Sequence, residues 1–368
     1  MKILFLESFF GGSHRDFAIG MKEYSTHDID IVPLPAGNWK WRMRGAGLYF
    51  AKHIKNIDKY DLIFASDMMN LADFISISSI KPIPVILYFH ENQLTYPLSP
   101  EQKVDLQFGY INMSSALAAT KVFFNSKLHF DQFISKLDLL IALMPDFKPG
   151  WVKDEIVKKS RVLYPGCRFS ESDIKHDRPE QKDEPPLIIW NHRWEWDKQP
   201  NIFFSVLRLI KAKNISFRLA LLGERYEEMP YEIFENAKKE FSNEIISFKY
   251  VKSKEQYISL LKKGSIVVST AIQENFGIAV VEAVKMGCVP LLPDRLSYPE
   301  IMPGKYLNRI LYSSKQDLIL KLENMLLDYH SYADLRKNLS LFMGKYSWQI
   351  MIKEYDREFE KIANRKLK

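Results

Sequence analysis

Short apolar runs recur along this chain, and each is separated from the next by a longer amphipathic stretch. Spacing of roughly 25 to 35 residues between such runs is typical of β-α-β units built around a buried parallel sheet. The first set of predicted strands covers residues 2–6, 30–34, 62–65, 85–89, 122–124 and 162–164. The second set covers residues 187–190, 219–222, 246–251, 266–269, 289–292 and 310–312.

A change of composition separates the two sets. Residues 176–186 (HDRPEQKDEPP) are charged, contain proline and lack large apolar side chains, as is typical of an interdomain linker. A chain of 368 residues is also too long for one compact core. We therefore predict two Rossmann-like α/β domains, over 1–170 and 187–345, joined by a linker over 171–186.

The last segment, residues 346–368, has the pattern of a long amphipathic helix. Its apolar residues recur at helical spacing, at Trp348, Met351, Ile352, Tyr355, Phe359 and Ile362. From periodicity alone, we expect this helix to pack on the domain that it follows.

Composition excludes several classes of protein. With 46% hydrophobic and 26% charged residues, the chain is neither disordered nor collagen-like. Cys167 and Cys288 form no CxxC pair, so neither a zinc site nor a disulfide framework is indicated. The apolar start stops at Glu7, too early for a signal peptide or a membrane span, which favours a cytoplasmic protein. The net charge of +7 favours an anionic partner, whether nucleotide, RNA or acidic lipid.

Two glutamates with seven residues between them form the most specific motif. Glu274 and Glu282 lie in the segment ENFGIAVVE, which follows a predicted strand and opens a predicted helix that ends near Gly287. Glu274 would lie at the carboxyl edge of the sheet, where open α/β sheets bind ligands, and Gly277 lets backbone approach that ligand. The helix N-terminus would face an anion such as phosphate. For an arbitrary pair, one exposed loop glutamate and one solvated helical glutamate would be the simpler interpretation.

A pair of cations follows the first predicted strand of the second domain. The segment Asn191–Lys198 (NHRWEWDK) contains Arg193 and Lys198, which could converge on one diphosphate. Cations in such a loop are usually ordinary surface charges. Their position at the carboxyl end of a strand favours phosphate binding.

Taken together, these motifs resemble a known enzyme family. The Glu-x7-Glu element, the Arg-x4-Lys element and Gly11-Gly12 after the first strand are similar to retaining GT-B glycosyltransferases of the family 4 type, over essentially the whole chain. Four segments more narrowly resemble the tRNA-queuosine mannosyltransferases: 6–14 (LESFFGGSH), 39–44 (WKWRMR), 89–97 (FHENQLTYP) and 191–195 (NHRWE). The resemblance implies a GT-B fold, in which two Rossmann-like domains face a cleft and the helix over 346–368 crosses back to the first domain.

The resemblance also implies roles on the donor side. Arg193 and Lys198 would hold the donor diphosphate, Glu274 would grip the hydroxyls of the transferred sugar, and Glu282 would accept a hydrogen bond from the ribose. Further donor contacts would come from Gly11, Gly12, Asn191, Asn275, Phe276, Gly277 and Ile278. Two cations and a helix N-terminus can stabilise a leaving phosphate without a metal, so we expect no cofactor, and the DxD sequence at 28–30 is incidental.

Polar residues end another strand of the first domain. The resemblance implies that His90 lies beside the reacting sugar carbon and that Glu91, Asn92 and Gln93 contact the acceptor. A His or Glu here could instead act as a general base for the acceptor hydroxyl. His90 alone could be a satisfied core histidine, but four consecutive polar residues argue against burial.

Aromatic and basic residues alternate directly after the second predicted strand, in the segment containing Trp39, Lys40, Trp41, Arg42 and Arg44. Tryptophan offers a stacking face to a base, and lysine or arginine meets phosphate, so a loop of this kind could bind an RNA acceptor. An amphipathic lid or a contact with a membrane surface explains the same residues equally well. The resemblance favours RNA.

The resemblance therefore implies transfer of mannose from GDP-mannose to queuosine in tRNA, with retention and with no assigned protein nucleophile. The expected partners are a nucleotide sugar and tRNA carrying queuosine, without stable membrane insertion. One alternative is a family 4 type enzyme that uses another nucleotide sugar and a lipid or polysaccharide acceptor. A second is a non-catalytic GT-B module that binds nucleotide or RNA. A glycosidase also uses two carboxylates but has no need of the Arg–Lys pair.

Overall fold

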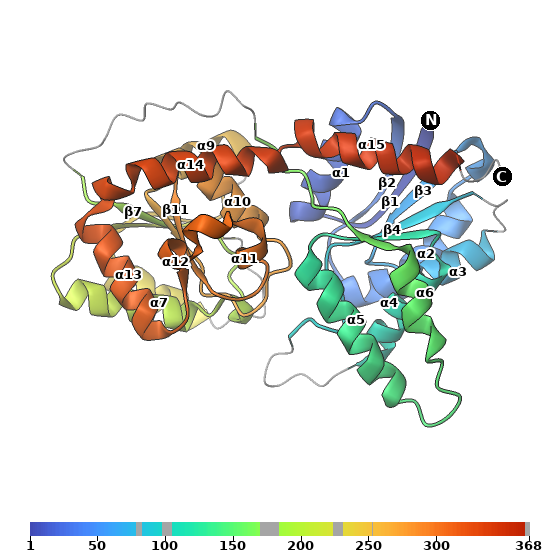
Figure 1. The fold of residues 1–368 in the computed structure, drawn as a ribbon, viewed down its shortest axis with the longest axis horizontal. Helices are drawn as coiled ribbons and strands as arrows, with labels where there is room; N and C mark the ends of the chain where they lie inside the picture. Colours follow the sequence, from blue (N-terminus) through green and yellow to red (C-terminus); the bar gives the residue numbers. More distant parts are fainter. Residues whose placement is uncertain (79–82, 98–104, 170–183, 224–230, 252, 365–368) are drawn as a thin grey trace. The chain divides into compact units, whose positions relative to one another are not determined.

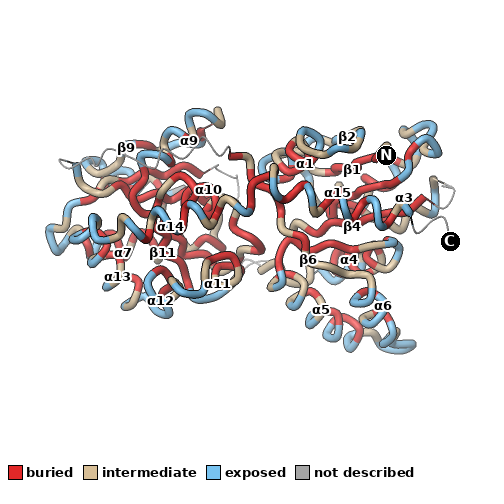
Figure 2. The backbone as a smooth tube through the Cα atoms, turned by 45° about the horizontal axis from the view of Figure 1, so that its top comes forward, coloured by how far each residue is buried: buried red, intermediate tan, exposed pale blue. Residues whose placement is uncertain are grey.

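Two compact units make up the chain in a computed structural model, which describes residues 1–78, 83–97, 105–169, 184–223, 231–251 and 253–364. The first unit combines Met1–Arg168 with Tyr346–Lys368, and the second is Phe169–Lys345. Each unit contains one six-stranded parallel sheet, whose buried strands are red in Figure 2. Most of the predicted linker over 171–186, namely residues 171–183, lies outside the described residues.

The sheet of the first unit follows the order β2-β1-β3-β4-β5-β6. Its strands are β1 (Lys2–Phe10), β2 (Asp28–Pro35), β3 (Leu62–Ser66), β4 (Val85–Phe89), β5 (Lys121–Phe124) and β6 (Ser160–Val162). The sixth strand therefore begins two residues before its predicted range of 162–164. The strand order reverses direction between β1 and β3, and loops at such a reversal form the usual ligand site of an open α/β sheet.

Helices cover both faces of this sheet (Figure 1). They are α1 (Gly12–Tyr24), α2 (Trp39–His53), α3 (Leu71–Ile77), α4 (Leu106–Ala118), α5 (Lys127–Ala142), α6 (Trp151–Lys159) and α15 (Trp348–Asn364), with the short 3-10 turn η1 (Ile57–Lys59). Alternate residues of β1 face opposite ways: Phe5 packs with α1 and α15, whereas Leu4 packs in the core that α2 to α6 cover. Burial on both faces explains why these strands read as continuous apolar runs.

The last helix, α15, belongs to the first unit, as the resemblance implied and against the expectation from periodicity alone. It lies beside α1, and Trp348 is fully buried with its ring 5.3 Å from that of Phe17 (Figure 1). At the other end of α1, the Asp356 carboxylate accepts hydrogen bonds from Ser25 Oγ at 2.6 Å and Thr26 N at 2.9 Å. Apolar packing and buried polar contacts thus fix the helix on this unit.

The sheet of the second unit follows the order β12-β11-β10-β7-β8-β9. Its strands are β7 (Leu187–Trp190), β8 (Arg218–Leu221), β9 (Ile245–Phe248), β10 (Ile266–Val268), β11 (Val289–Pro293) and β12 (Leu311–Tyr312). This is the strand order of a dinucleotide-binding sheet, with its reversal between β7 and β10. The loops that follow these two strands carry the Arg-x4-Lys and Glu-x7-Glu motifs.

Eight α-helices of the second unit lie in its described part. They are α7 (Pro200–Ala212), α8 (Tyr231–Glu240), α9 (Lys254–Lys263), α10 (Ile278–Lys285), α11 (Tyr298–Ile301), α12 (Leu307–Ile310), α13 (Lys315–Leu327) and α14 (Ala333–Met343). Short 3-10 turns are η3 (Trp196–Lys198), η4 (Gly304–Tyr306) and η5 (Tyr329–Tyr332), and η6 (Gly344–Tyr346) precedes α15. No helix in the described ranges combines the length and the apolar composition that crossing a membrane requires.

Two glycines in helices allow a matched test of how α15 is held. A Cβ on Gly20 of α1 would lie 2.0 Å from Trp348 Nε1, whereas a Cβ on Gly45 of α2 would meet nothing within 4 Å. Gly-to-Ala changes inside helices usually stabilise by about 0.5–1 kcal/mol, whereas overpacking a core costs about 1–3 kcal/mol. We therefore expect Gly45→Ala to raise the free energy of unfolding and Gly20→Ala to lower it, as measured by urea denaturation. Equal effects of the two changes would contradict the packing of Trp348 against α1.

Candidate functional site

The second unit carries its polar groups in the loops after β7 and β10. Two hydrogen bonds tie these loops together: Thr270 Oγ1 donates to Lys198 O at 2.7 Å, and Ile272 N donates to Asp197 O at 2.8 Å. The turn η3, which ends at Lys198, is therefore held against the segment that leads to Glu274. These contacts bring Lys198 next to Gln273, which is 75 positions away in the chain.

Lys198 is a buried cation at the centre of this arrangement. Its side chain is only 7% exposed; Nζ donates to Gln273 O at 2.7 Å and lies 3.0 Å from Asp197 Oδ2 and 3.6 Å from Glu274 Oε2. Burial opposes its charge, but the Glu274 and Asp197 carboxylates more than offset burial and raise the pKa of Lys198. A fixed positive charge in a dry environment is what binding of a diphosphate requires.

Arg193 lies on the same loop and is more exposed. Its guanidinium Nη2 is 3.0 Å from Glu195 Oε2, and 43% of its side chain is accessible. Arg193 can therefore reach an incoming anion from the surface, whereas Lys198 acts from within the fold. Arg193 is also close enough to Lys198 for the repulsion between their positive charges to lower the pKa of Lys198, although the carboxylates outweigh this effect.

Glu274 and Gly277 shape the start of α10. Gly277 has φ of +92°, a left-handed conformation that favours glycine, and a Cβ there would lie 3.3 Å from the Tyr298 ring. Gly287 ends the helix with φ of +98°, as the sequence predicts. The helix N-terminus follows directly after the loop that carries Glu274, which is one-fifth exposed. Asn275, Phe276 and Ile278 flank Gly277, and Phe276 is buried with its carbonyl bonded to Ser297 Oγ.

Glu282 has a partner that the motif alone does not reveal. Its carboxylate forms an ion pair with Lys254 at the start of α9, and its side chain is only 6% exposed. Beside it, Asn191 Nδ2 donates to Tyr257 OH and to Ala279 O, both at 2.8 Å. Burial and the adjacent Glu282 charge raise the pKa of Tyr257 well above its usual range. Asn191 thus connects the end of β7 to α9 and α10.

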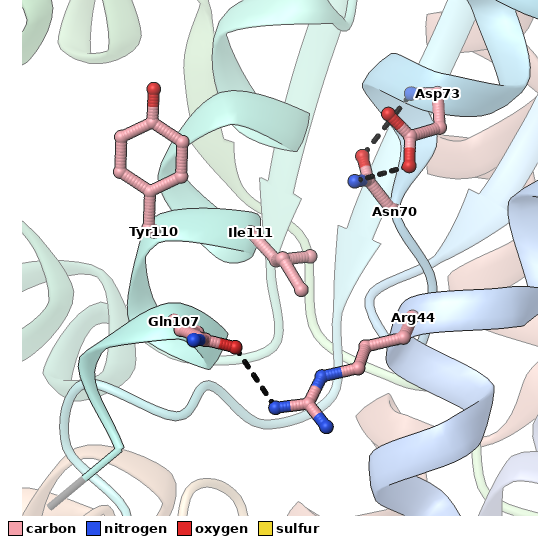
Figure 3. A pocket seen from close by; sticks show the side chains of 6 residues that line it. All are labelled: Arg44, Asn70, Asp73, Gln107, Tyr110 and Ile111. Carbon is pink, nitrogen blue, oxygen red and sulfur yellow. Dashed lines mark hydrogen bonds between the residues drawn. The ribbon is translucent and has the colours of Figure 1, made fainter.

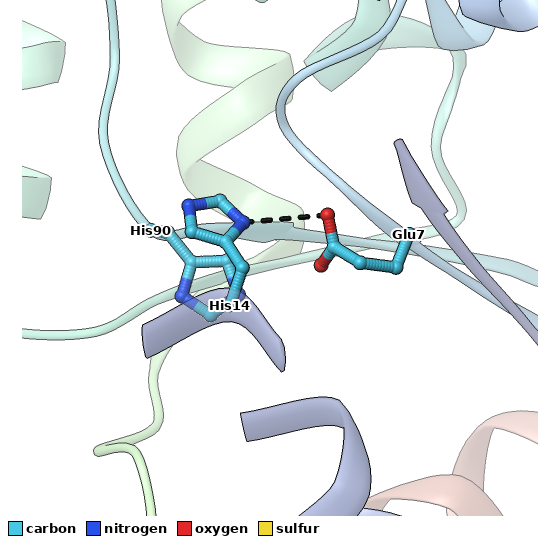
Figure 4. Close-up of side chains that lie close together, drawn as sticks. All are labelled: Glu7, His14 and His90. Carbon is cyan, nitrogen blue, oxygen red and sulfur yellow. Dashed lines mark hydrogen bonds and ion pairs between the residues drawn. The ribbon is translucent and has the colours of Figure 1, made fainter. Parts of the chain in front are cut away.

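In the first unit, an ion pair lies at the reversal of strand order. Glu7 on β1 is fully buried, and its Oε1 accepts hydrogen bonds from Phe9 N and Ser66 Oγ, both at 2.9 Å. The same oxygen is 3.3 Å from His14 Nδ1 on α1 (Figure 4). Burial alone would lower the pKa of His14, but the Glu7 carboxylate, with help from Asp67, raises it to about 9. His14 is therefore an imidazolium at neutral pH.

His90 packs directly on this pair, after the end of β4. Its ring centroid is 4.2 Å from that of His14, and its backbone N donates to Asp67 Oδ1 at 2.9 Å. Its carbonyl accepts from Asn125 Nδ2 at 2.8 Å. Burial and the His14 charge hold the pKa of His90 well below its usual range, whereas burial raises the pKa of Asp67 to about 8. His90 is therefore neutral, and hydrogen bonds at its backbone N–H and carbonyl hold it in place.

Within the described ranges, one group of side chains has the spacing of a metal site. Ligand-type atoms of Glu7, His14 and His90 lie within 4.8 Å of one another (Figure 4). The raised pKa of His14 favours a proton on its ring, next to the Glu7 carboxylate, and a metal ion bound there would have to displace that proton. We therefore interpret the group as an ion pair of Glu7 and His14, with the neutral His90 ring packed against it at a tilt of 40°.

The polar loop after His90 is held by its own side chains. Asn92 is buried, and its Oδ1 accepts from Leu94 N and Thr95 N, both at 3.0 Å. Gln93 Nε2 donates to Glu91 Oε1 at 3.3 Å. Asn92 thus shapes the loop, while Glu91 and Gln93 remain partly exposed. Gly11 and Gly12 lie at the same edge, where β1 leads into α1: Gly11 precedes the helix, and Gly12, with φ of +49°, is its first residue.

The segment from Trp39 to Arg44 is the beginning of α2, not the loop that its composition predicted. Trp39 packs on Phe108, with ring centroids 5.1 Å apart, and Lys40 lies over the Trp39 ring at 5.6 Å. Both Arg42 Nε and Nη2 donate to Pro35 O. Trp41 is 70% exposed. Trp41 therefore has a ring face open to a ligand, whereas Trp39 and Arg42 have structural contacts.

The DxD sequence has an ordinary explanation. Asp28 and Asp30 lie at the amino end of β2, the opposite edge of the sheet from the site, and each pairs with Lys2, at 3.6 and 3.5 Å. A hydrogen bond from Tyr60 lowers the pKa of Asp30, with a further contribution from Lys2. These carboxylates stabilise a surface cluster.

Sequence reasoning missed several members of the site. Glu7 and His14 occur within a motif that carried the resemblance, but neither was predicted to have a role, and Asp67 and Lys254 were not singled out at all. A glutamate inside an apolar run, seven residues before a histidine, is a signal that could have been noticed. Lys254 lies 28 residues from Glu282 and has no local signal.

Comparison with known proteins identifies the family. The family model for the N-terminal part of tRNA-queuosine alpha-mannosyltransferase matches residues 2–167, and that for glycosyl transferases group 1 matches 171–340. The tRNA-queuosine alpha-mannosyltransferase of Drosophila melanogaster is 36% identical over 330 residues, which cover 88% of this chain and 86% of that protein. This chain belongs to the tRNA-queuosine alpha-mannosyltransferase family. It is a glycosyltransferase.

More distant relatives agree with this assignment. A GDP-mannose:cellobiosyl-diphosphopolyprenol alpha-mannosyltransferase from Xanthomonas oryzae pv. oryzae is 23% identical over 178 residues, 47% of this chain and 46% of that protein. Among solved structures, Anabaena HepE in complex with UDP has a TM-score of 0.69 at 16% identity, covering 98% of this chain and all of that one. Sucrose-phosphate synthase from Thermosynechococcus elongatus has a TM-score of 0.70 at 12% identity, covering 98% and 99%. The chain therefore has the predicted GT-B fold.

Two buried groups of the first unit, His14 and Asp67, make the stability of this mannosyltransferase family member depend on pH. The pKa of His14 is raised from 6.5 to about 9 and that of Asp67 from 3.8 to about 8, so the folded state binds both protons more tightly than the unfolded state. Their contribution to stability is complete at pH values below their unfolded pKa values and is lost as pH rises through 8 and 9. Each proton difference corresponds to a slope of about 1.4 kcal/mol per pH unit.

We expect the free energy of unfolding of the first unit to fall as the pH rises from 7 to 8. In Asp67→Asn, the fall per pH unit should be about half as large, since one of the two titrating groups is lost. Urea unfolding at several pH values, followed through NMR signals of this unit, measures both slopes. Asp131→Asn, a change at an exposed carboxylate of α5, is the matched control and should leave the slope unchanged. An unaltered slope in Asp67→Asn would contradict the raised pKa of Asp67.

Proposed function

We propose that this protein transfers mannose from GDP-mannose to queuosine in tRNA, with retention at the anomeric carbon. The observation that carries the proposal is the 36% identity to a tRNA-queuosine alpha-mannosyltransferase over 88% of the chain. The buried Lys198 beside Glu274 adds physical support, because it supplies charge for a phosphate next to a carboxylate that can accept sugar hydroxyls.

GDP-mannose as the donor rests on the names of the relatives and on the chemistry of the second unit. Lys198 and Arg193 would bind the diphosphate, and the α10 N-terminus would add backbone N–H groups. Glu274 would orient the mannosyl group, and Glu282, oriented by Lys254, would accept from the ribose. Asn191, Asn275, Phe276, Gly277 and Ile278 would complete this half of the donor site, and Gly11 and Gly12 would contribute from the first unit.

Transfer then needs little beyond charge stabilisation and orientation. The acceptor hydroxyl oxygen attacks the anomeric carbon, the bond from that carbon to the β-phosphate oxygen breaks, and the hydroxyl proton passes to the departing diphosphate. Lys198 and Arg193 stabilise the charge that grows on the leaving group. His90, neutral at working pH, would lie beside the reacting carbon and act by hydrogen bonding and not by charge. We propose that no metal takes part.

On the acceptor side, the first unit would hold the RNA. Trp41 offers an exposed ring for stacking, Lys40, Arg42 and Arg44 add positive charge, and Trp39 supports the helix that carries them. Glu91, Asn92 and Gln93 would form the loop next to His90, with Asn92 fixing its shape.

The decisive experiment is mass spectrometry of tRNA nucleosides after incubation of the protein with GDP-mannose and queuosine-containing tRNA, with and without EDTA. A hexose-shifted queuosine that forms equally in both reactions is expected. Transfer to a lipid or polysaccharide acceptor without transfer to tRNA would replace this proposal with the membrane-associated alternative. Binding of donor and tRNA without any product would indicate a non-catalytic module.

Arg193 gives a better test of the donor site than Lys198, because 43% of its side chain is exposed, whereas Lys198 is buried against two carboxylates. We expect Arg193→Ala to lower turnover by about 10²–10³-fold, the usual effect of removing one group that stabilises transition-state charge. Arg208→Ala, in α7, removes an exposed arginine that pairs with Glu240 and should leave turnover unchanged. Nucleoside mass spectrometry over a time course measures both rates. Equal rates in the two variants would remove Arg193 from the donor site.

The two glutamates of the motif should behave differently. Glu274→Gln should mainly lower kcat, since it orients the sugar during transfer, whereas Glu282→Gln should mainly raise the KM for GDP-mannose through the ribose. Lys254→Gln should resemble Glu282→Gln, because Lys254 fixes the Glu282 carboxylate. Initial rates at varied donor concentration separate kcat from KM. Identical profiles for Glu274→Gln and Glu282→Gln would show that the roles are misassigned.

A further inference from the structure

An open hollow of about 360 Å³ lies on the first unit between α2, α3 and α4 (Figure 3). Its lining residues are Arg44, Asn70, Asp73, Gln107, Tyr110 and Ile111. Among these, only Arg44 was predicted to contact the acceptor. The hollow lies next to the exposed start of α2, where the RNA is proposed to bind.

Close packing fixes the wall of the hollow that α2 forms. A Cβ on Gly47 would lie 2.3 Å from Asn70 O, so only glycine lets α2 approach the start of α3 this closely. The Arg44 guanidinium lies over the Phe108 ring at 4.8 Å, and its Nη2 donates to Gln107 Oε1 at 2.9 Å. The guanidinium is therefore held in one position at the edge of the hollow.

The opposite wall presents a fixed carboxylate. Asp73 N donates to Asn70 Oδ1 at 3.1 Å, and Asn70 Nδ2 donates back to Asp73 Oδ2 at 2.8 Å (Figure 3). No described residue donates to the other carboxylate oxygen, Oδ1, which is available to a ligand. On the α4 side, 53% of Tyr110 is exposed. A carboxylate, a guanidinium and an aromatic ring thus surround one space.

This combination matches one class of nucleobase. A carboxylate pairs with two adjacent N–H donors, and among the common RNA bases guanine alone presents them, as its ring N–H and its exocyclic amino group. The guanine carbonyl lies next to these donors and suits the Arg44 guanidinium. The other bases would place a lone pair or a carbonyl against Asp73, which is repulsive. Tyr110 can pack on the face of the ring.

We propose that this hollow binds a base with a guanine-type edge from the RNA acceptor, with Asp73 accepting from its N–H groups, Arg44 donating to its carbonyl and Tyr110 packing on its face. The proposal rests on the proposed function, because it takes RNA as the acceptor. Two bases could supply this edge: queuosine itself, which keeps the hydrogen-bonding edge of guanine, or a neighbouring guanine in the same loop.

The test is binding of short stem-loop RNAs with a single loop guanosine, placed either at the target position or beside it, and of matched RNAs with inosine, which lacks the amino group. We expect the wild-type protein to bind one of the guanosine RNAs about ten-fold more tightly than its inosine counterpart, the usual value of a good base contact. Asp73→Asn should abolish this preference while leaving inosine RNA binding nearly unchanged. The position at which inosine weakens binding identifies which base occupies the hollow.

Matched variants separate this contact from general effects on RNA affinity. Tyr110→Ala should weaken both RNAs of the sensitive pair, whereas Tyr49→Ala, which removes an exposed tyrosine stacked on His53, should weaken neither. Asp131→Asn should keep the guanosine preference. Thermal unfolding would test whether Asp73→Asn is folded. This change is isosteric, and the amide oxygen can still accept a hydrogen bond from Asn70 Nδ2.

The failure of this proposal differs from the failure of the proposed function. Preference for guanosine that persists in Asp73→Asn, or that is absent from the wild type at both positions, would overturn the proposal even if mannose is transferred to tRNA. Preference that depends on Asp73 but occurs in a protein that transfers no mannose would support the hollow and overturn the proposed function.

Discussion

Burial of both faces of two parallel sheets is the constraint on which the rest of this structure depends. Ile3 and Phe5 pack on one side of β1 and Leu4 and Leu6 on the other, so no face of the sheet is left for polar chemistry. Functional side chains therefore gather at the carboxyl edge, in its loops and, for Glu7, near the carboxyl end of β1. In each unit, the reversal of strand order opens that edge, between β1 and β3 or between β7 and β10.

Buried charges are compensated differently at the carboxyl edges of the two sheets. Lys198 is compensated by Asp197 and Glu274, both close to it in space, so that a cation stays available for an anionic ligand. At the other edge, Glu7 and His14 neutralise each other, and burial, together with the charge on His14, lowers the pKa of the adjacent His90 and keeps it neutral. One edge is thus suited to binding negative charge, and the other to hydrogen bonding.

Much of this could be predicted from the sequence, because apolar runs follow directly from burial. All twelve predicted strands have a counterpart, and β4 and β7 match their predicted bounds. The start of α2 was missed although Asn38, directly before it, is a residue type that commonly begins helices. Here Asn38 has a left-handed conformation, with φ of +50°, and makes no side-chain hydrogen bond to the helix. The pair of Lys254 and Glu282 depends on packing between α9 and α10, which no local pattern encodes.

The position of α15 has a consequence for how the chain is made. The first unit is discontinuous: its final helix is synthesised only after the entire second unit has been synthesised. Until then, Phe17 of α1, which Trp348 covers, and Phe64 of β3, which Phe359 covers, remain open to water. The second unit is contiguous in the chain and can complete its core first. A nascent first unit therefore needs protection from aggregation for the time that about half of the polypeptide takes to be translated.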